Sequence, residues 1–324
     1  MQERVIPVSA IVPTLDRPDA LGRALHSLSA QGALPAELIV IDASGDASSK
    51  QMVERYAAQW SPQCTVLWQA ASLVGAAVQR NQGIALATQP FVLFFDDDVV
   101  FEDGCLVRLW HALENDRALA GVNAMITNQN YHPPGLVSRT VFAILNGGRE
   151  PTYAGRVLGP AVSLLPEDRD DLPEVVPVEW LNSTCTLYRR AVLPEPAFDS
   201  VFTGYSLMED LTLSLRVGRH WKLANVRTAR IFHDSQPGAH KSDLRKLSCM
   251  ELVNRHYVMT EILKRERFQD FCKLWFWELF QVALAAKSER LGAPFWLLLQ
   301  GKWQGVTTTL GSGRKDSMHD STKK

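Results

Sequence analysis

Three adjacent carboxylates, Asp96, Asp97 and Asp98, end the apolar run FFDDDV at residues 94–99. Like charges this close repel one another, so a cation or hydrogen-bond donors must offset the cost of gathering them. On a strand, alternate side chains point to opposite faces, so we expect Asp96 and Asp98 to point together and Asp97 away. Such oxygen ligands suit Mg²⁺ or Mn²⁺ bridging a diphosphate, and an acidic turn or a helix N-cap is the alternative.

Four more residues have side chains that could bind a ligand or transfer a proton: Arg80, Glu209, Asp210 and His233. MEDL at 208–211 puts Glu209 and Asp210 side by side at the expected start of a helix. This pair suits either electrostatic capping or a general base that takes a proton from a hydroxyl. His233 ends an apolar run, where a neutral imidazole serves as a ligand for Mn²⁺ or has a structural role. Arg80 could hold a phosphate or a base edge, or pair with an acid at the surface.

The first hundred residues alternate strand and helix patterns. Near-uniform apolar runs, such as VSAIVPT and ELIVID, are separated by segments with apolar residues at helical spacing. This alternation predicts an α/β fold with a mostly parallel sheet covered by helices on both faces. Ligands bind at the carboxyl ends of such strands, and polar clusters begin there at Thr14, Asp42 and Asp96.

The rest of the chain is less regular. We expect a helix over 104–116, a turn-rich stretch over 128–178 and an amphipathic helix within 205–221. Residues 236–310 read as a C-terminal helical region, and the polar segment 311–324 as a disordered tail.

Composition limits the class of protein and its partners. The chain has 324 residues, 46% hydrophobic and 21% charged, which is enough for a large buried core. Its net charge of −1 argues against a nucleic-acid partner. The five cysteines are odd in number and form no CxxC pair, which predicts buried free thiols. The first residues lack the pattern of a signal peptide, and no apolar run is long enough to span a membrane, so a cytoplasmic location is expected.

The C-terminal region differs from the rest in charge and aromatic content. Residues 236–324 contain 15 Lys and Arg against 9 Asp and Glu. Two apolar, aromatic segments, 268–286 and 291–303, follow a basic cluster. This pattern predicts either peripheral contact with the inner face of the plasma membrane, or a helical cap or dimer contact with the aromatic rings in the core.

Taken in order, the motifs resemble those of the family 2 glycosyltransferases, which have the GT-A fold. The succession is IVPTLDRP, LIVIDAS, QRNQGI, FFDDDV, VEWLNSTCTLYRR, MEDL and IFHD, over about residues 5–235. The resemblance implies a GT-A sheet with a nucleotide-sugar-binding half in residues 1–103. It further implies an acceptor-binding, catalytic half of the same domain in residues 104–235.

On the donor side, the resemblance implies a nucleoside-diphosphate sugar, such as a UDP-, dTDP- or GDP-sugar, and Mn²⁺ or Mg²⁺ as cofactor. The metal would be bound by Asp98 and His233, with Asp96 beside them. Residues in contact with the nucleotide sugar would be Pro13, Thr14, Asp42, Arg80, Asp96 and Asp97. The sequence departs from the family pattern at Asp16, Ala43, Ser44 and Gln79.

On the acceptor side, the resemblance implies a single displacement with inversion at the anomeric carbon. Asp210 would be the catalytic base, while Glu209 and the ring of Trp180 would bind the acceptor. The family analogy suggests a glycan or lipid-linked saccharide acceptor, in surface polysaccharide synthesis. Asn182-Ser183-Thr184 replace a segment that usually contains glycine.

Three other functions are alternatives to this one. A sugar-1-phosphate nucleotidyltransferase would need a GxGxR loop after the first strand, and an oxidoreductase a GxGxxG loop; IVPTLDRP contains neither. A catalytically inactive GT-A-like binding or scaffold protein would not need Asp96, Asp98, Asp210 and His233, which this chain has.

Overall fold

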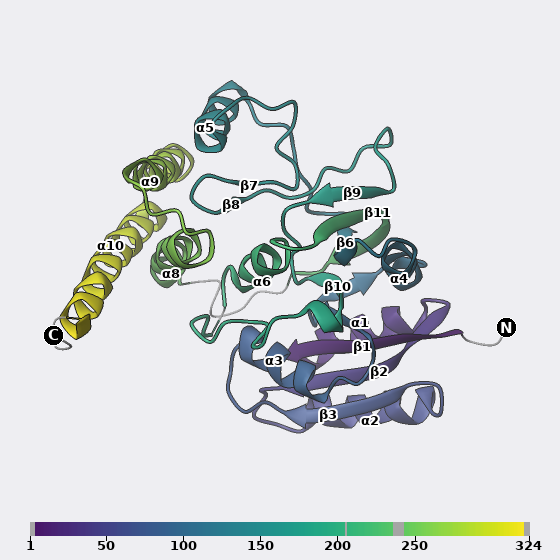
Figure 1. Cartoon of the computed structure of the whole chain (residues 1–324). Helices are drawn as coiled ribbons and strands as arrows, with labels where there is room; N and C mark the ends of the chain where they lie inside the picture. Colours follow the sequence, from purple (N-terminus) through teal and green to yellow (C-terminus); the bar gives the residue numbers. More distant parts are fainter. Residues whose placement is uncertain (1–3, 205, 236–242, 321–324) are drawn as a thin grey trace. The chain divides into compact units, whose positions relative to one another are not determined.

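The structure is a computed structural model that describes residues 4–204, 206–235 and 243–320. It is a mixed α/β fold in which strands and helices alternate through the first half (Figure 1). Two compact units are distinguished by their internal contacts. Unit 1 comprises residues 1–132, 154–156 and 163–236, and unit 2 comprises residues 133–153, 157–162 and 237–324.

The main sheet has nine strands in the order β3-β2-β1-β4-β10-β6-β11-β5, and β9 also pairs with β11. β1, β2, β3 and β4 run parallel, and β6 is parallel to β11, so the sheet is mostly parallel as predicted. β10 is antiparallel to both of its neighbours. The strands are β1 (Arg4–Thr14), β2 (Ala33–Asp42), β3 (Thr65–Ala70), β4 (Phe91–Phe95), β5 (Val99–Phe101), β6 (Leu119–Ile126), β9 (Val175–Val178), β10 (Cys185–Arg189) and β11 (Lys222–His233).

Helices cover both faces of this sheet because its strands are apolar on both sides. On β1, Ala10 and Val12 belong to the core cluster that includes α1, α2 and α4, whereas Ile11 points to the other face. There α3 approaches closely: a Cβ on Gly83 would lie 2.4 Å from the Ile11 side chain, so only glycine fits. The helices of unit 1 are α1 (Pro18–Ser29), α2 (Ser48–Trp60), α3 (Ala76–Leu86), α4 (Cys105–Asn115), α6 (Glu209–Val217) and the 3₁₀ turn η1 (Arg190–Val192).

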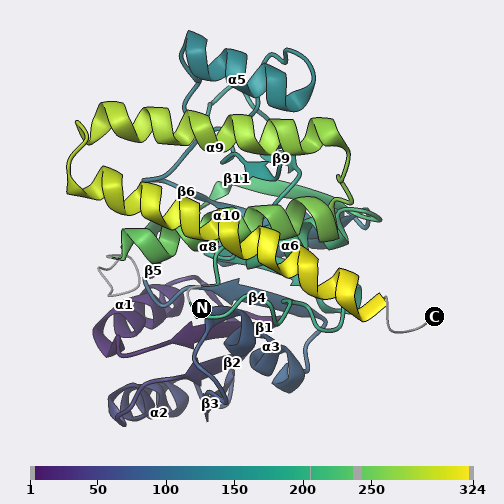
Figure 2. The ribbon, with the colours of Figure 1, turned by 90° about the vertical axis from the view of Figure 1, so that its left-hand side faces the viewer.

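Unit 2 is mainly helical. α9 lies beside α5 and α10, and α10 packs along α8 (Figure 2). Buried ion pairs join three of its helices, since Glu278 of α9 pairs with both Arg255 of α8 and Lys302 of α10. Its elements are α5 (Leu136–Asn146), β7 (Val157–Leu158), α8 (Leu244–Tyr257), the π-helix η2 (Val258–Ile262), α9 (Phe268–Ser288) and α10 (Ala293–Asp320), while β8 (Val162–Ser163) spans the boundary with unit 1.

Three features differ from the sequence-based expectations. The stretch 128–178 contains α5, β7, β8 and β9, and residues 133–153 group with the C-terminal helices. α10 runs through residues 311–320, where we expected a disordered tail, and residues 321–324 lie outside the described part of the chain. Of the five cysteines, three are buried as expected, but Cys249 is half-buried and Cys272 is exposed.

Candidate active site

Parallel strands bring the predicted polar clusters to one edge of the sheet. β1, β2 and β4 run in the same direction, and β1 lies between the other two. Thr14 ends β1, Asp42 ends β2, and the Asp96–Asp98 turn follows β4, so all three lie at the carboxyl ends of their strands. Thr14 lies directly opposite Asp42 in the register of β1 and β2. These residues are close in space because of the sheet topology, although they are far apart in the sequence.

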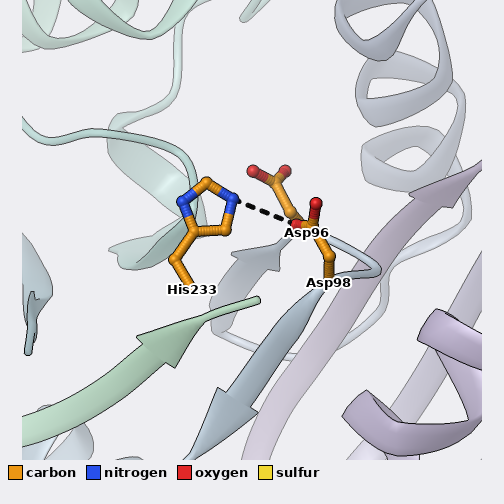
Figure 3. Close-up of side chains that lie close together, drawn as sticks. All are labelled: Asp96, Asp98 and His233. Atoms are coloured by element: carbon orange, nitrogen blue, oxygen red, sulfur yellow. Dashed lines mark hydrogen bonds and ion pairs between the residues drawn. The ribbon is translucent and has the colours of Figure 1, made fainter. Parts of the chain in front are cut away.

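Asp96, Asp98 and His233 form a cluster in which one atom of each lies within 4.8 Å of the others (Figure 3). His233 Nε2 is 3.1 Å from Asp98 Oδ1. The cluster forms because β5 follows Asp98 directly and pairs antiparallel with the end of β11, which sets His233 opposite Val99. Gln129 Nε2 lies 3.3 Å from the other ring nitrogen of His233, and the sequence analysis did not identify this neighbour.

Asp97 points away from this cluster, as predicted for the middle carboxylate. The Thr14 hydroxyl donates a hydrogen bond of 2.8 Å to Asp97, and Arg17 lies 3.2 Å from it. Arg17 also contacts Asp98 at 3.4 Å, a role that the sequence analysis missed. Burial raises the pKa of Asp97 to about 6, although Thr14 and Arg17 favour its charged form. Asp97 thus anchors the acidic turn to β1.

Asp42 is held by two donors at the end of β2. The Trp68 indole donates to one carboxylate oxygen at 3.1 Å, and the Ser44 backbone N–H donates to the other at 2.8 Å. Nearby, the buried Gln79 amide donates to the backbone oxygens of Thr14 and Ile41. Gln79 therefore ties the ends of β1 and β2 together where the family pattern has alanine. Pro13 is buried within β1, so its side chain faces the interior rather than solvent.

Arg80 links the acidic turn to the start of α6. It is only 2% exposed, and it pairs with Asp96 at 2.7 Å and with Glu209 at 2.8 Å. Burial raises the pKa of Glu209, and Asp210 adds to this rise, while Arg80 opposes it. The Glu209 carboxylate is therefore committed to Arg80 instead of standing free to meet an acceptor.

Asp210 lies beside this ion pair and is partly exposed. Its carboxylate accepts hydrogen bonds from the backbone N–H groups of Ser183 at 3.3 Å and Leu211 at 2.6 Å. Burial raises the pKa of Asp210, and the two N–H groups and Arg80 oppose the rise. The preceding Met208 has φ of 75°, a left-handed conformation that costs a non-glycine residue roughly 1–3 kcal/mol. This turn aims the first residues of α6 toward the acidic turn.

Trp180 lies at the other end of the segment that leads to β10. Its indole N–H donates to the Leu164 backbone oxygen at 2.8 Å, and the ring is half-buried. Two residues on, Asn182 and Ser183 are buried, and Ser183 contacts both Glu209 and Asp210. The segment without glycine thus contacts Glu209 and Asp210 through Ser183, a contact that its sequence did not reveal.

We predict that Arg80→Met destabilises the protein. The substitution leaves Glu209 buried without its cation, and breaking such a pair costs about 3–5 kcal/mol of unfolding free energy. Urea denaturation measures the loss. Arg23→Met is the control, because Arg23 forms an exposed pair with Asp234 that contributes under about 1 kcal/mol. Equal losses in the two variants would contradict a structural role for the buried pair.

The family model described as Glycosyl transferase family 2 matches residues 9–194, which is more than half of the chain. The chain belongs to this family. The match contains the acidic turn, Arg80 and the Trp180 segment; Asp210 and His233 follow it. In this family 2 chain, the predicted site residues from Thr14 to His233 all fall within unit 1.

Relatives and solved structures agree with this assignment. The uncharacterized glycosyltransferase YibD of Escherichia coli (strain K12) is 33% identical over 118 residues, 36% of this chain and 33% of that protein, so the match spans about a third of this curated relative. The mannosyltransferase PcManGT of Pyrobaculum calidifontis, in complex with GDP-Man and Mn²⁺, aligns with a TM-score of 0.55 at 14% identity, over 93% of this chain and 87% of that chain. GalNAc-T7 with UDP, GalNAc and Mn²⁺ aligns with a TM-score of 0.53 at 15% identity, over 78% of this chain and 47% of that chain. At these identities the likeness establishes the fold, which is GT-A as predicted.

The residues of the Asp96, Asp98 and His233 cluster fit a divalent cation. Carboxylate oxygens and an imidazole nitrogen are ligands that Mn²⁺ accepts, and the carboxylates suit Mg²⁺ as well. Three protein ligands leave further coordination positions for the oxygens of a substrate. The cluster is therefore a candidate metal site at the edge of the GT-A sheet.

Proposed function

We propose that this chain transfers a sugar from a nucleoside-diphosphate donor to a hydroxyl of a glycan or lipid-linked saccharide, with inversion at the anomeric carbon. The observation that carries the proposal is the Arg80 bridge, which joins the candidate metal cluster to the acidic pair that starts α6. Sugar transfer needs the metal cluster, which would bind the donor, and a base for the acceptor hydroxyl within one site. Related folds bind GDP-Man or UDP with Mn²⁺, which supports a nucleotide ligand for this chain as well.

For the donor, we assign the metal to Asp98, His233 and Asp96, and the base and ribose to the end of β1 and β2. Asp42 would accept from the nucleoside, and Trp68 and Ser44 orient its carboxylate. Thr14 and Asp97 would contact the nucleotide sugar from the same edge. A bound Mn²⁺ or Mg²⁺ would stabilise the negative charge on the departing diphosphate.

For the acceptor, Asp210 would take the proton from the attacking hydroxyl oxygen as that oxygen bonds to C1 of the sugar and the bond from C1 to the diphosphate oxygen breaks. The hydrogen bonds from Ser183 and Leu211 hold the Asp210 carboxylate in place. Glu209 would act through Arg80 and Ser183, and Trp180 would offer its ring to an acceptor sugar. A cytoplasmic location and a role in surface polysaccharide synthesis stay predictions.

The proposal is tested by incubating the full chain with UDP-, dTDP- and GDP-sugars, Mn²⁺ and glycan or lipid-linked acceptors. We expect one donor to yield a nucleoside diphosphate and a glycosylated acceptor, and NMR of the product to give the anomeric configuration opposite to the donor's. A product with the donor's configuration would contradict the single displacement. If no donor yields product, the chain is better described as a binding or scaffold protein of the same fold.

The pKa of Asp210 leads to a pH prediction. A base acts only when it is deprotonated, so kcat falls as pH is lowered through the pKa of Asp210. Because that pKa is raised, the midpoint of the fall should lie above the usual value of about 3.9. The negative charge of Asp96 adds to the rise, so Asp96→Asn should shift the midpoint to lower pH. The check is kcat against pH at saturating substrates, and a midpoint that Asp96→Asn leaves in place would contradict the assignment.

A further inference from the structure

An uncharged apolar stripe runs along the exposed side of α9. Its members follow one another at intervals of three or four residues, so they lie on one face over about 22 Å of helix. Phe268 is 85% exposed and Leu279 is 68% exposed. We call this surface the α9 stripe; it consists of Phe268, Cys272, Trp275, Phe276, Leu279 and Ala283, all of them exposed.

The charged residues of the same stretch are buried or half-buried, and each has a partner within unit 2. Glu278 is buried in ion pairs with Arg255 and Lys302. The Lys273 ammonium donates to the Leu145 backbone oxygen at the end of α5, and Asp270 accepts from the backbone N–H that precedes α9. The inner side of α9 is apolar too, since Leu274 and Trp277 are buried there, and its exposed side has no charged residue between 268 and 283. A helix that faces water usually has a polar, charged outer side, so an exposed apolar side of this length marks an interaction surface.

The helices of unit 2 next to α9 also expose large apolar side chains. α5 lies next to α9 and exposes Leu136 and Val137, which are 86% and 71% exposed. α10 lies on the other side of α9 (Figure 2) and exposes Trp296 and Trp303. Tryptophan and phenylalanine are the residues that favour the boundary between lipid headgroups and acyl chains.

The net charge of unit 2 identifies the kind of partner. Its residues include 17 Lys and Arg against 10 Asp and Glu, whereas the whole chain has a net charge of −1. A second copy would bring two positively charged units together, which electrostatic repulsion opposes. An anionic lipid surface attracts such a unit and offers an apolar layer to the α9 stripe.

We propose that the α9 stripe binds the surface of an anionic lipid bilayer, with α9 lying in the plane of the interface. Among the helices that the structure describes, none is long and apolar enough to cross a membrane, so the helix would lie on the bilayer. Binding would bring the chain to the surface where a lipid-linked acceptor resides, and this consequence alone rests on the proposed function.

The test is sedimentation of the full chain with vesicles of phosphatidylcholine, with and without phosphatidylglycerol. We expect binding to the anionic vesicles, weakened by added salt, and little binding to the neutral ones. Leu279→Glu puts a negative charge into the α9 stripe, and we expect it to lower the partition coefficient at least about tenfold. Trp275→Gln should also lower it. Because both side chains are exposed, the folded state should be retained, which circular dichroism checks.

Trp221→Gln is the matched control, since Trp221 is 42% exposed but belongs to unit 1. It should bind vesicles like the wild-type chain. The proposal is overturned if the wild-type chain ignores anionic vesicles, or if Leu279→Glu binds them as well as Trp221→Gln does. A wild-type dimer in sedimentation velocity that Leu279→Glu dissociates, without any vesicle binding, would identify a second copy as the partner instead.

Vesicle binding needs neither donor nor metal, so its outcome is independent of the chemistry. We expect Asp210→Asn to bind vesicles like the wild-type chain even though its transferase activity is lost. Loss of vesicle binding in Asp210→Asn would mean that binding depends on the site in unit 1, contrary to the proposal.

Discussion

Asp210→Asn is expected to lower kcat by about 10²–10⁴-fold while leaving the affinity for the nucleoside diphosphate and Mn²⁺ nearly unchanged. The amide keeps the shape of the side chain and can still accept from Ser183, but it cannot take a proton from the acceptor hydroxyl. Asp210 is also absent from the candidate metal cluster, so donor binding should not depend on its charge. Steady-state kinetics and nucleotide titration measure the two quantities separately.

The control for this variant is Asp103→Asn, because Asp103 is an exposed aspartate of the same unit and is not among the candidate site residues. Its kcat should equal that of the wild-type chain. If Asp210→Asn weakened nucleotide binding as strongly as kcat, Asp210 would belong to the donor site, and another group would have to serve as base.

Asp98→Asn is expected to lower turnover by at least about 100-fold, through loss of the metal-dependent donor affinity. Asp98 contributes an oxygen to the cluster with Asp96 and His233, and its side chain is only 4% exposed. An amide oxygen is a much weaker ligand than a carboxylate for a divalent cation. Titration of Mn²⁺, followed by its electron paramagnetic resonance signal, measures the affinity for the metal directly.

Asp96→Asn tests whether the two outer carboxylates have different roles. Asp96 also pairs with Arg80, so part of its contribution is to hold that guanidinium between the two acidic groups. We expect a smaller loss of Mn²⁺ affinity in Asp96→Asn than in Asp98→Asn. Equal Mn²⁺ affinity in Asp98→Asn and the wild-type chain would exclude Asp98 as a metal ligand.

The part of this fold that sequence predicts best is the alternation of the first hundred residues. Apolar strands such as β1 and β2 have a local signal, and their parallel pairing brings Thr14 and Asp42 to one edge. The sequence also predicted that Asp96 and Asp98 point together and Asp97 away from them. That prediction assumed a strand, whereas these residues lie in the turn between β4 and β5.

Most partners of these residues could not be predicted from local patterns, because they depend on pairing between distant segments. The place of His233 beside Asp96 and Asp98 was implied by the family resemblance alone. His233 lies beside Asp98 since β11 pairs antiparallel with β5, and no local pattern specifies that register. Arg80 is close to Glu209 because α3 and the start of α6 meet, 129 residues apart in the sequence. The Trp68 indole donates to Asp42, and the Ser183 backbone N–H donates to Asp210. No sequence motif indicates either donor, so these contacts appear only in the folded chain.

We expect the Asp96, Asp98 and His233 cluster to bind a metal that in turn binds a nucleoside diphosphate. A thermal-shift measurement of the wild-type chain with UDP, dTDP, GDP and CMP, each with and without Mn²⁺, tests it most directly. A ligand at about 100 times its Kd stabilises the folded state by about 2.7 kcal/mol, which is a visible shift. We predict that one nucleoside diphosphate raises the melting temperature only when Mn²⁺ is present. The same rise with and without Mn²⁺, or no rise with any nucleotide, would contradict the claim.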